Sequence, residues 1–523
     1  MKYFRCLVSL ITCISLLLSV TVFSFSASAE QPTLESYLVS QIDSMGQSEK
    51  TKIDCSHYIN DYENYNTFVV SLSNAINNVF NQHPEFFFTK LANIETKTGI
   101  ANFTYIDYSS RQRLFDDYSL IKNFGTQITS TVSQSFSNYE KALYLHDILI
   151  SNLKKGTNYQ NNINFEKADS EIYSLLYEYL LKLSSIESDT IIDYATSHYW
   201  NAVKLGEYWY FIDTYNDDND IEGRLSHSHF ILNKSEINPV YSSWSFKNIS
   251  LTEDSTYSND VIKNARTKVF ISDDYKYVNN LGQFVSYDKS TGSTTTLVDI
   301  TDRWTSFSDN GYYSGNYSAL DYLNGYYLIS TPKKVLAYKD GQTNILYTIN
   351  STKSEIYGLN VDDSINVVLK TTDSSSSSTI ETLDFTLNVE VIDEYVKVNQ
   401  QITSDNIKID YYCFGEELNI KIEDVDFNDC QLQATTDVVK KATGSISYNG
   451  KTAEFNYTTY MLGDINRDNS IGAIDVLLLR MAILNQKELT NDEFKSASLT
   501  NSNSIGALDL LLLKKLTLNI SDN

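Results

Sequence analysis

Hydrophobic residues in the first half of the chain recur at the spacing of helices. Three segments carry apolar side chains every three or four residues along one face: Phe68 to Phe80, Ser137 to Leu153 and Ser170 to Leu183. This spacing predicts three amphipathic helices, and Ser137 is a candidate N-cap for the second. The aromatic run from Tyr208 to Thr214 predicts a strand. Together these elements predict an α+β domain over residues 30–244.

Residues 245–373 lose the helical spacing and show short aromatic and β-branched runs between turn residues. The clearest runs are Lys268 to Ser272, Gly282 to Asp288, Gly325 to Ser330 and Lys334 to Asp340. Such runs predict β-hairpins. The segment resembles the hairpin repeats of β-propeller blades in bacterial surface proteins, but it holds too few copies to close a propeller. We therefore expect an all-β repeat region.

Residues 385–459 alternate between apolar and polar positions, as strands with one buried face do. Before them, the serine run from 374 to 378 predicts a flexible linker over residues 374–384. Asn449-Gly450 stands between two strand-like runs, as a two-residue hairpin turn requires. This hairpin resembles the last one of bacterial immunoglobulin-like modules, which implies an Ig-like β-sandwich that serves as a spacer.

The C-terminal segment contains one motif twice. Residues 464–475 are followed 34 residues later by residues 498–509, and each copy runs into a leucine-rich stretch. The first copy places oxygen-bearing side chains at positions 1, 3, 5 and 12, as a calcium loop of the EF-hand type does. Its candidate ligands are Asp464, Asn466, Asp468, Asp475 and the backbone carbonyl of Ser470. The pattern therefore predicts a Ca²⁺ site.

This twofold loop-plus-helix unit, residues 460–523, resembles the type I dockerin module. The resemblance implies an all-α calcium-binding domain whose partner is a cohesin module of a scaffoldin or a cell-surface protein. The second loop departs from the family, because Ser498, Thr500 and Ser502 replace carboxylates and amides and leave Asp509 as its one charged ligand. Since affinity follows the charge of the ligands, we expect one Ca²⁺ and leave occupancy of the second loop open.

In dockerins the cohesin is contacted by two pairs of positions in each repeat. The resemblance carries this role to small or apolar residues flanked by cations, namely Ala473, Ile474, Arg480, Ala507, Leu508, Lys514 and Lys515. Most of the leucine stripe is expected to pack the module's own core. The second loop is either empty or held by hydrogen bonds and by packing of Leu511 and Leu512, and the two alternatives stay open.

His198-Tyr-Trp200-Asn201 is followed, fifteen residues after the histidine, by Asp213 at the end of a predicted strand. Together with the upstream segments Asn81 to Phe87 and Tyr139 to Asp147, this motif resembles the transglutaminase-like superfamily of papain-type thiol enzymes. The resemblance implies that His198 is a base, that Asp213 orients it and that Trp200 walls the site. A cysteine at a helix N-terminus is the nucleophile in that family.

Here Ser170 stands where the family has its cysteine. A hydroxyl has no thiolate-like form near neutral pH, so we expect Ser170, His198 and Asp213 to form a degenerate, inactive triad in a domain that binds a peptide or polysaccharide. The alternatives are a serine hydrolase or peptidase that uses these three residues, and an accessory protein in polysaccharide breakdown. We also expect His146-Asp147 to be a surface or packing pair, and residues 217–220 to be a solvated loop.

The N-terminus and the overall charge bear on where the protein works. Residues 1–29 combine two basic residues, an apolar run and Ala27-Ser28-Ala29, which predicts a secretory signal peptide. No other stretch is long and apolar enough to span a bilayer. The net charge of −25 disfavours nucleic acid and anionic membranes as partners. We therefore expect a secreted, extracellular component of a cellulosome- or amylosome-like complex that takes part in polysaccharide breakdown.

Beyond the predicted signal the chain has three cysteines, Cys55, Cys413 and Cys430. Cys413 and Cys430 are candidates for one disulfide.

Overall fold

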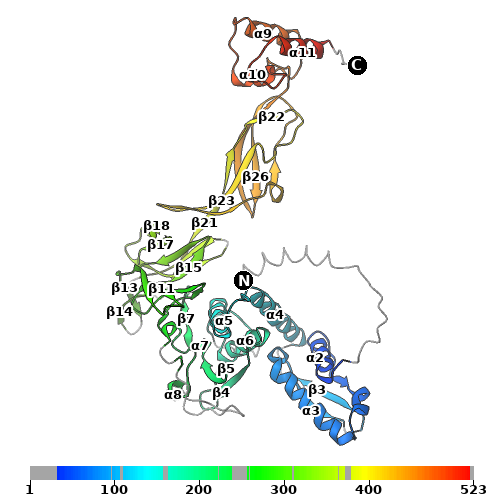
Figure 1. Cartoon of the computed structure of the whole chain (residues 1–523), viewed down its shortest axis with the longest axis vertical. Helices are drawn as coiled ribbons and strands as arrows, with labels where there is room; N and C mark the ends of the chain where they lie inside the picture. The colour runs from blue at the N-terminus through cyan, green and yellow to red at the C-terminus, as the bar shows by residue number, and fades with distance from the viewer. Residues whose placement is uncertain are drawn as a thin grey trace.

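The computed structural model describes residues 32–95, 97–106, 110–156, 163–221, 223–237, 256–257, 260–308, 311–362, 364–371 and 378–518. Figure 1 shows a row of modules, with helical units at one end, β-sheets in the middle and a small helical module at the other end. The predicted signal peptide, residues 1–29, lies outside the described residues. Among the residues described, no helix has the length and apolar character that a bilayer crossing requires.

The first unit packs two helices and a three-stranded sheet around one apolar core. The sheet has the order β1-β3-β2. The predicted helix at Phe68 to Phe80 is confirmed and is slightly longer than predicted, because Asn64 caps its first turn. The elements are α2 (Leu34–Met45), β1 (Lys52–Asp54), η1 (Ser56–Asp61), α3 (Tyr65–Gln82), η2 (Pro84–Phe86), β2 (Thr89–Ile94) and β3 (Ile100–Tyr105).

In the second unit one helix, α6, packs on an antiparallel sheet of order β4-β5-β6, and two further helices, α4 and α5, pack on that helix. The other two predicted helices are confirmed: α5 begins after the capping box of Ser137 and Glu140, and α6 has the predicted bounds. The elements are α4 (Arg111–Ser130), α5 (Asn138–Asn152), α6 (Ser170–Leu183), β4 (Ser188–Asp193), β5 (His198–Leu205), β6 (Tyr208–Ile212), α7 (Thr214–Asp217), β7 (Asp218–Ile221), β8 (Arg224–Leu225) and α8 (Lys234–Ile237).

The β-rich region contains two four-stranded antiparallel meanders, β9 to β12 and β15 to β18, and a hairpin, β13-β14. Side chains of both meanders share one core that includes Phe284 and Trp304. The elements are η3 (Val261–Asn264), β9 (Phe270–Ile271), β10 (Asp274–Val278), β11 (Gln283–Asp288), β12 (Thr294–Asp299), β13 (Trp304–Ser308), β14 (Gly311–Gly315), β15 (Leu320–Leu323), β16 (Tyr326–Ser330), β17 (Lys334–Lys339) and β18 (Gln342–Thr348).

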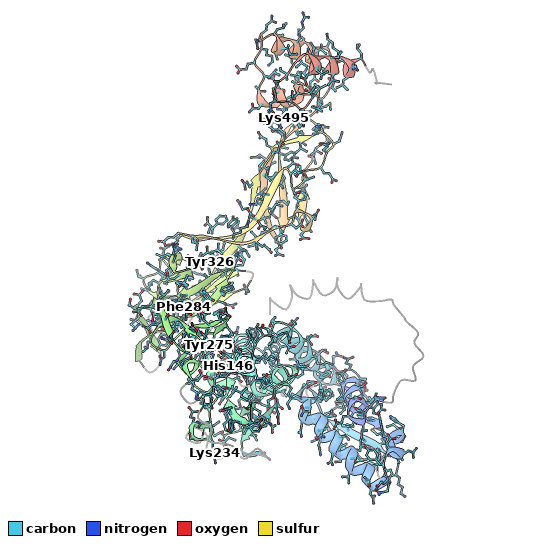
Figure 2. The ribbon with its side chains drawn as sticks, viewed as in Figure 1. His146, Lys234, Tyr275, Phe284, Tyr326 and Lys495 are labelled. Atoms are coloured by element: carbon cyan, nitrogen blue, oxygen red, sulfur yellow. The ribbon has the colours of Figure 1, made fainter. Side chains whose placement is uncertain are left out.

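The predicted boundary near residue 245 does not separate two cores. Tyr275, Tyr277 and Val285 of the first meander belong to the same buried cluster as residues of α5 and α6. Tyr275 donates its hydroxyl to Glu140 of α5 at 3.3 Å, and Figure 2 labels Tyr275 and His146 of α5 in this part of the molecule. A polar contact adds to the packing, because Lys289 lies 2.7 Å from Glu140 of α5. The helical unit and the first meander therefore form one body.

The predicted linker over residues 374–384 is wrong from residue 378 onward. A single strand, β21 (Ser378–Val391), pairs with β20 (Ser364–Thr371) along its first half and with β23 (Ile407–Phe414) along its second. The serine run lacks apolar residues, but the backbone of residues 378–384 is held by hydrogen bonds to β20. Residues 372–377 lie outside the described residues. The strand thus connects two modules directly.

Beyond this junction two sheets pack face to face as a β-sandwich. One sheet of the sandwich consists of the second half of β21 with β23 and β24, and the other has the order β22-β27-β26-β25. On the other side of the junction, the first half of β21 pairs with β20 and β20 with β19, and β19 packs on β15 and β16 of the second meander. Asn449 and Gly450 both have positive φ (47° and 71°) between paired strands, so the predicted hairpin turn is confirmed. The remaining elements are β19 (Ser354–Val361), β22 (Tyr395–Lys397), β24 (Asn419–Asp424), η4 (Phe427–Asp429), β25 (Gln431–Gln433), β26 (Lys441–Tyr448) and β27 (Lys451–Tyr460).

The cysteine pair predicted as a candidate disulfide is not bonded. Cys55, Cys413 and Cys430 are all free thiols. Cys413 is buried in the sandwich core, and burial raises the pKa of its thiol to about 11. This part of the fold is therefore held by packing and hydrogen bonds.

The C-terminal module consists of α9 (Ala473–Ile483), α10 (Asn491–Ala497) and α11 (Ala507–Thr517). Ile465, Leu479, Ala497 and Leu513 form its small buried core. The two long helices begin at the twelve-residue loops that the sequence predicts.

Candidate functional site

The first calcium loop is closed by Asp475, the third residue of α9. Its carboxylate is 1% exposed and accepts backbone N–H groups from Ile465 at 2.8 Å, Asn466 at 3.0 Å and Gly472 at 2.8 Å. The loop backbone is thereby wound around one carboxylate. These hydrogen bonds hold the start of the loop, which carries the candidate ligands, against the first turn of α9.

Asp464 opens the same loop and is also fully buried. It accepts backbone N–H groups from Asp468 at 3.1 Å and from Asn469 at 2.9 Å. Burial raises the pKa of the Asp464 carboxyl, and the neighbouring carboxylates of Asp475 and Asp468 push it in the same direction. Carboxylate oxygens are the donors that Ca²⁺ prefers, and this loop has two buried carboxylates, Asp464 and Asp475, and an exposed one, Asp468.

The residues of the first loop therefore fit calcium. Asp464, Asn466, Asp468 and Asp475 would supply side-chain oxygens, and Ser470 its carbonyl. The ion would neutralise the mutual repulsion of the carboxylates, so its binding would stabilise the folded loop.

The second loop uses its hydroxyl groups differently. Ser498 donates to the carbonyl of Ser502 at 2.8 Å, and Thr500 donates to Asp509 at 2.8 Å. Burial opposes ionisation of Asp509, but N–H and hydroxyl donors of Thr500 and the N–H of Gly506 outweigh it and lower the pKa of the carboxyl. The hydroxyls thus serve as donors within the loop, and Asp509 is its one carboxylate. This donor set fits calcium poorly.

The predicted partner-binding residues lie on the surface. Ile474 and Leu508 are 59% and 58% exposed at equivalent positions of α9 and α11. Ala473, Arg480, Ala507 and Lys514 are also exposed, and Lys515 is half-buried.

Leu477 and Leu511 are exposed as well, one turn further along their helices. The alternative in which Leu511 packs beneath the second loop is therefore wrong, since Leu513 fills that core position instead. The helical register decides this difference, because residues 511 and 513 lie about 200° apart around the axis.

A second candidate site lies in the α/β unit, where the structure brings together the three predicted triad residues. Nε2 of His198, the first residue of β5, lies 2.7 Å from Asp213, which follows β6. Ser170 is the first residue of α6, and its Oγ accepts the backbone N–H of Tyr199 at 3.2 Å. Ser170 therefore contacts the backbone of the residue that follows His198 in β5.

Aromatic side chains surround His198, and the group of Ser170, His198 and Asp213 is called the cleft below for the role proposed for it. The ring of Trp200 stacks on His198 with centroids 5.9 Å apart, and Tyr215 meets His198 edge-on at 5.8 Å. Asn201, the last residue of the motif, is fully buried and donates to the carbonyl of Ser174 at 2.9 Å. This bond holds β5 against α6, so it fixes the distance between the histidine and the helix that carries Ser170.

Sequence reasoning missed a buried chain of alternating histidines and aspartates behind the cleft. His146 and Asp147 are 0% and 4% exposed, so a surface pair is excluded and the packing pair is confirmed. Asp217 is fully buried and ends α7, so the predicted solvated loop at 217–220 is wrong. The signal was present in the sequence, because a histidine inside an apolar helix face needs a polar partner when it is buried.

The paired loops, each followed by a helix with an exposed apolar pair, define a calcium-binding docking module. Residues 462–518 match the Dockerin type I domain. This match confirms the predicted dockerin, and such domains bind calcium and take a cohesin as partner. Proteins with this domain are typically extracellular components of cellulosome-like complexes.

No curated protein matches the chain. Among solved structures, a chain of the S. cerevisiae complex of Dbp5, Nup159 and Gle1 is 9% identical with a TM-score of 0.15, over 52% of this chain and 61% of that one. PorZ, a surface component of the type-IX secretion system of Porphyromonas gingivalis, is 10% identical with a TM-score of 0.15, over 49% and 32%. Neither likeness carries an argument about function.

Proposed function

We propose that the protein is a secreted component of a cellulosome- or amylosome-like complex, held on a cohesin by calcium-dependent docking. The observation that carries this proposal is the exposed pair Ile474 and Leu508, each next to a buried loop-closing carboxylate, Asp475 or Asp509. Apolar residues with cations at their rim are typical of protein interfaces. Arg480 and Lys514 supply the cations here.

The module takes one calcium ion, in the first loop. Three carboxylates lie in that loop and one lies in the second, where Ser498 and Thr500 donate their protons to loop oxygens. A loop held by its own hydroxyls keeps its conformation without an ion. The two halves of the module therefore differ in their response to chelators.

Capture of the full chain by immobilised type I cohesins tests the proposed docking. Ile474→Asp and Leu508→Asp together should abolish capture in calcium, because each places a charge in the proposed contact. Val70→Asp is the matched control, since Val70 is 61% exposed on α3 and lies outside the module. Capture of the double variant at the wild-type level would contradict the proposed surface.

The α/β unit is a transglutaminase-like domain that binds a peptide or polysaccharide, and the sandwich is an Ig-like spacer. Support for the first assignment is the placement of Ser170 at the start of α6, His198 at the start of β5 and Asp213 after β6. Serine at the nucleophile position favours binding over catalysis, because its hydroxyl is not ionised near neutral pH. Affinity electrophoresis in xylan, cellulose and starch tests the binding of polysaccharides, and a peptide array tests that of peptides.

One observation favours a second candidate, a serine hydrolase. The 2.7 Å contact between His198 and Asp213 is the geometry that orients a general base. A fluorophosphonate should then label the wild type and neither Ser170→Ala nor His198→Ala. Absence of label in the wild type would contradict this candidate and leave the binding role.

A further inference from the structure

The buried histidine-aspartate chain behind the cleft has His146 at its centre. Nδ1 of His146 lies 2.8 Å from Asp147, and its Nε2 lies 3.3 Å from Asp217. His227 extends the chain on the Asp147 side at 2.8 Å, and His229 extends it on the Asp217 side at 3.1 Å. The order is therefore His227, Asp147, His146, Asp217, His229.

Geometry alone fixes the charge of the central ring. A neutral imidazole carries one N–H, so it donates to only one of two carboxylates. Both nitrogens of His146 lie against oxygens of buried carboxylates, so a neutral ring would turn the lone pair of one nitrogen toward an anionic oxygen. His146 is therefore a buried imidazolium. In agreement, burial opposes its charge, but the bonds to Asp147 and Asp217 outweigh burial and raise the pKa of His146 to about 9.

Asp217, which is bonded to His146, is connected through hydrogen bonds to Asp213 of the cleft. Its carboxylate accepts the backbone N–H of His229 at 3.0 and 3.1 Å, and the carbonyl of His229 accepts the N–H of Asp213 at 3.1 Å. Asp213 also caps α7, the short helix that ends at Asp217, through the N–H of Asn216. The imidazolium thus holds both ends of the segment from Asp213 to Asp217.

The first meander is joined to the same chain. The second oxygen of Asp147 accepts the backbone N–H of Val269 at 2.7 Å, just before β9. Figure 2 shows His146 at this junction. Other ionisable groups near the chain include Tyr177, whose pKa is raised by burial and by both carboxylates, Arg266 beside Asp217, and Lys155 near His229.

We propose that His146 is a permanent imidazolium that positions Asp213, and through it His198, by clamping Asp217. The proposal concerns the cleft of the proposed function, but it holds whether that cleft binds or catalyses. His146 touches neither Ser170 nor His198 in any contact described here, so it is a positioning residue. Its effect must then be visible at His198.

NMR of the full chain with ¹⁵N- and ¹³C-labelled histidine tests this directly. In the wild type both ring nitrogens of His146 should remain protonated from pH 5 to about pH 8, below the pKa that the two carboxylates produce. A single protonated nitrogen at pH 6, or a bound transition metal at His146, Asp147 and His227, would overturn the proposal. This measurement needs no variant.

His146→Gln supplies the second arm, because glutamine keeps hydrogen-bonding capacity without the charge. The ring ¹⁵N and ¹³C chemical shifts of His198 should change in this variant, because Asp213 loses its fixed position. His83→Gln is the matched control, since His83 also lies 2.9 Å from a carboxylate, that of Glu85, but outside the chain. Unchanged His198 chemical shifts in folded His146→Gln, or an equal change in the control, would overturn the proposal. Loss of cohesin capture is a separate readout that neither variant should affect.

A different set of contacts carries a second inference, at the junction of the sandwich and the dockerin. Asn469 of the first calcium loop accepts the backbone N–H of Val439 at 2.6 Å. Arg467 of the same loop pairs with Asp492 of α10, which also contacts Tyr395 at 3.0 Å and Lys441 at 3.1 Å. Val439, Tyr395 and Lys441 all belong to the sandwich side.

Both loop residues depend on the conformation of the loop. Arg467 and Asn469 have positive φ, 62° and 68°, which is the left-handed region that calcium loops use between their ligands. Lys495 of α10 reinforces the junction, since it lies over the ring of Tyr395 at 5.0 Å, and Figure 2 labels it there. A change in the loop therefore moves the groups that hold the dockerin on the sandwich.

We infer that calcium in the first loop also fixes the dockerin on the sandwich, so calcium binding and formation of the dockerin–sandwich junction are linked. Because linkage is reciprocal, loosening the junction must weaken calcium binding. The combined variant Tyr395→Phe, Lys441→Ala and Lys495→Ala leaves every loop ligand intact and should raise the calcium Kd of the full chain about fivefold or more in calorimetry.

Lys487→Ala is the control for this experiment. Lys487 lies 2.8 Å from Glu493 within the dockerin and makes no sandwich contact in the ion pairs described. It should leave the calcium Kd unchanged. An unchanged Kd in the triple variant would overturn the inferred link, whether or not the protein docks on a cohesin.

Discussion

Replacing the loop-closing carboxylates one at a time separates the two halves of the dockerin. Asp475 accepts three backbone N–H groups. Asp509 accepts N–H groups from Thr500 and Gly506 and the hydroxyl of Thr500. The two carboxylates thus have three donors each in their own loops. They differ in that only the first loop has the donor set for calcium.

The structure sets the magnitude of each change. Hydrogen bonds to a charged group contribute about 1.5–3 kcal/mol each, and water recovers part of that when the acceptor is removed. Asp475→Ala and Asp509→Ala should therefore each lower the local opening free energy by about 3 kcal/mol without calcium. Calcium at about 100 times its Kd should add about 2.7 kcal/mol to the wild type. Asp509→Ala should keep that gain, and Asp475→Ala should lose it.

Hydrogen exchange with mass spectrometry on the full chain measures these energies, read on peptides from residues 464–518 with calcium and with EDTA. In EDTA the two variants should lose the same local opening free energy relative to the wild type. In calcium Asp475→Ala should lose more than Asp509→Ala. If Asp509→Ala abolished the calcium gain while Asp475→Ala kept it, the ion would lie in the second loop. Loss of the gain in both variants would show two coupled ions and would refute the reasoning.

Further predictions concern the rest of the chain. Iodoacetamide at pH 8 should alkylate half-buried Cys430 first, because burial raises the pKa of the Cys55 thiol to about 12 and that of Cys413 to about 11; equal rates by mass spectrometry would contradict this. Leu383→Pro, inside β21, should cost about 1–3 kcal/mol through a lost strand hydrogen bond and lower the melting temperature of the β-rich region and the sandwich together; a loss confined to one of them would contradict a shared strand. The α/β unit should lose stability in acid between pH 3.8 and about 2, because burial opposes ionisation of Asp147 and Asp217 but histidine contacts outweigh it and lower the pKa of both carboxyls to about 2. A carboxyl whose pKa is lowered in the folded state stabilises the fold at pH values above its pKa in the unfolded chain, and this stabilisation is lost as the carboxyl is protonated. Acid unfolding followed by tryptophan fluorescence measures the loss. An acid transition in Asp217→Asn equal to that of the wild type would contradict the role of Asp217.

Local signals in the sequence were sufficient for several elements. The bounds of α6 agree with the predicted Ser170 to Leu183, and the cap of α5 is the predicted Ser137. The turn at Asn449-Gly450 is likewise set by its own residues, since both adopt positive φ. The calcium loop belongs to the same class, because its ligands lie within twelve consecutive residues.

Long-range contacts account for the errors. Asp217 reads as part of an acidic loop, but it is buried because His146, 71 residues earlier, and His229 both bond to it. The segment 378–384 reads as a linker, but β20 supplies the hydrogen bonds that make it a strand. The boundary at residue 245 was wrong for the same reason, since Asp147 bonds to Val269 from 122 residues away. In each case the bonding partner lies far away in the sequence, and no local pattern predicts which residue it is.

The most direct test of calcium-dependent docking is surface plasmon resonance of the full chain over immobilised type I cohesins. The chain should bind in calcium, dissociate or fail to bind in EDTA, and bind again when calcium is restored, because the first loop needs the ion to hold its carboxylates together. Binding of equal strength with and without calcium, or no binding to any type I cohesin in calcium, would contradict the account.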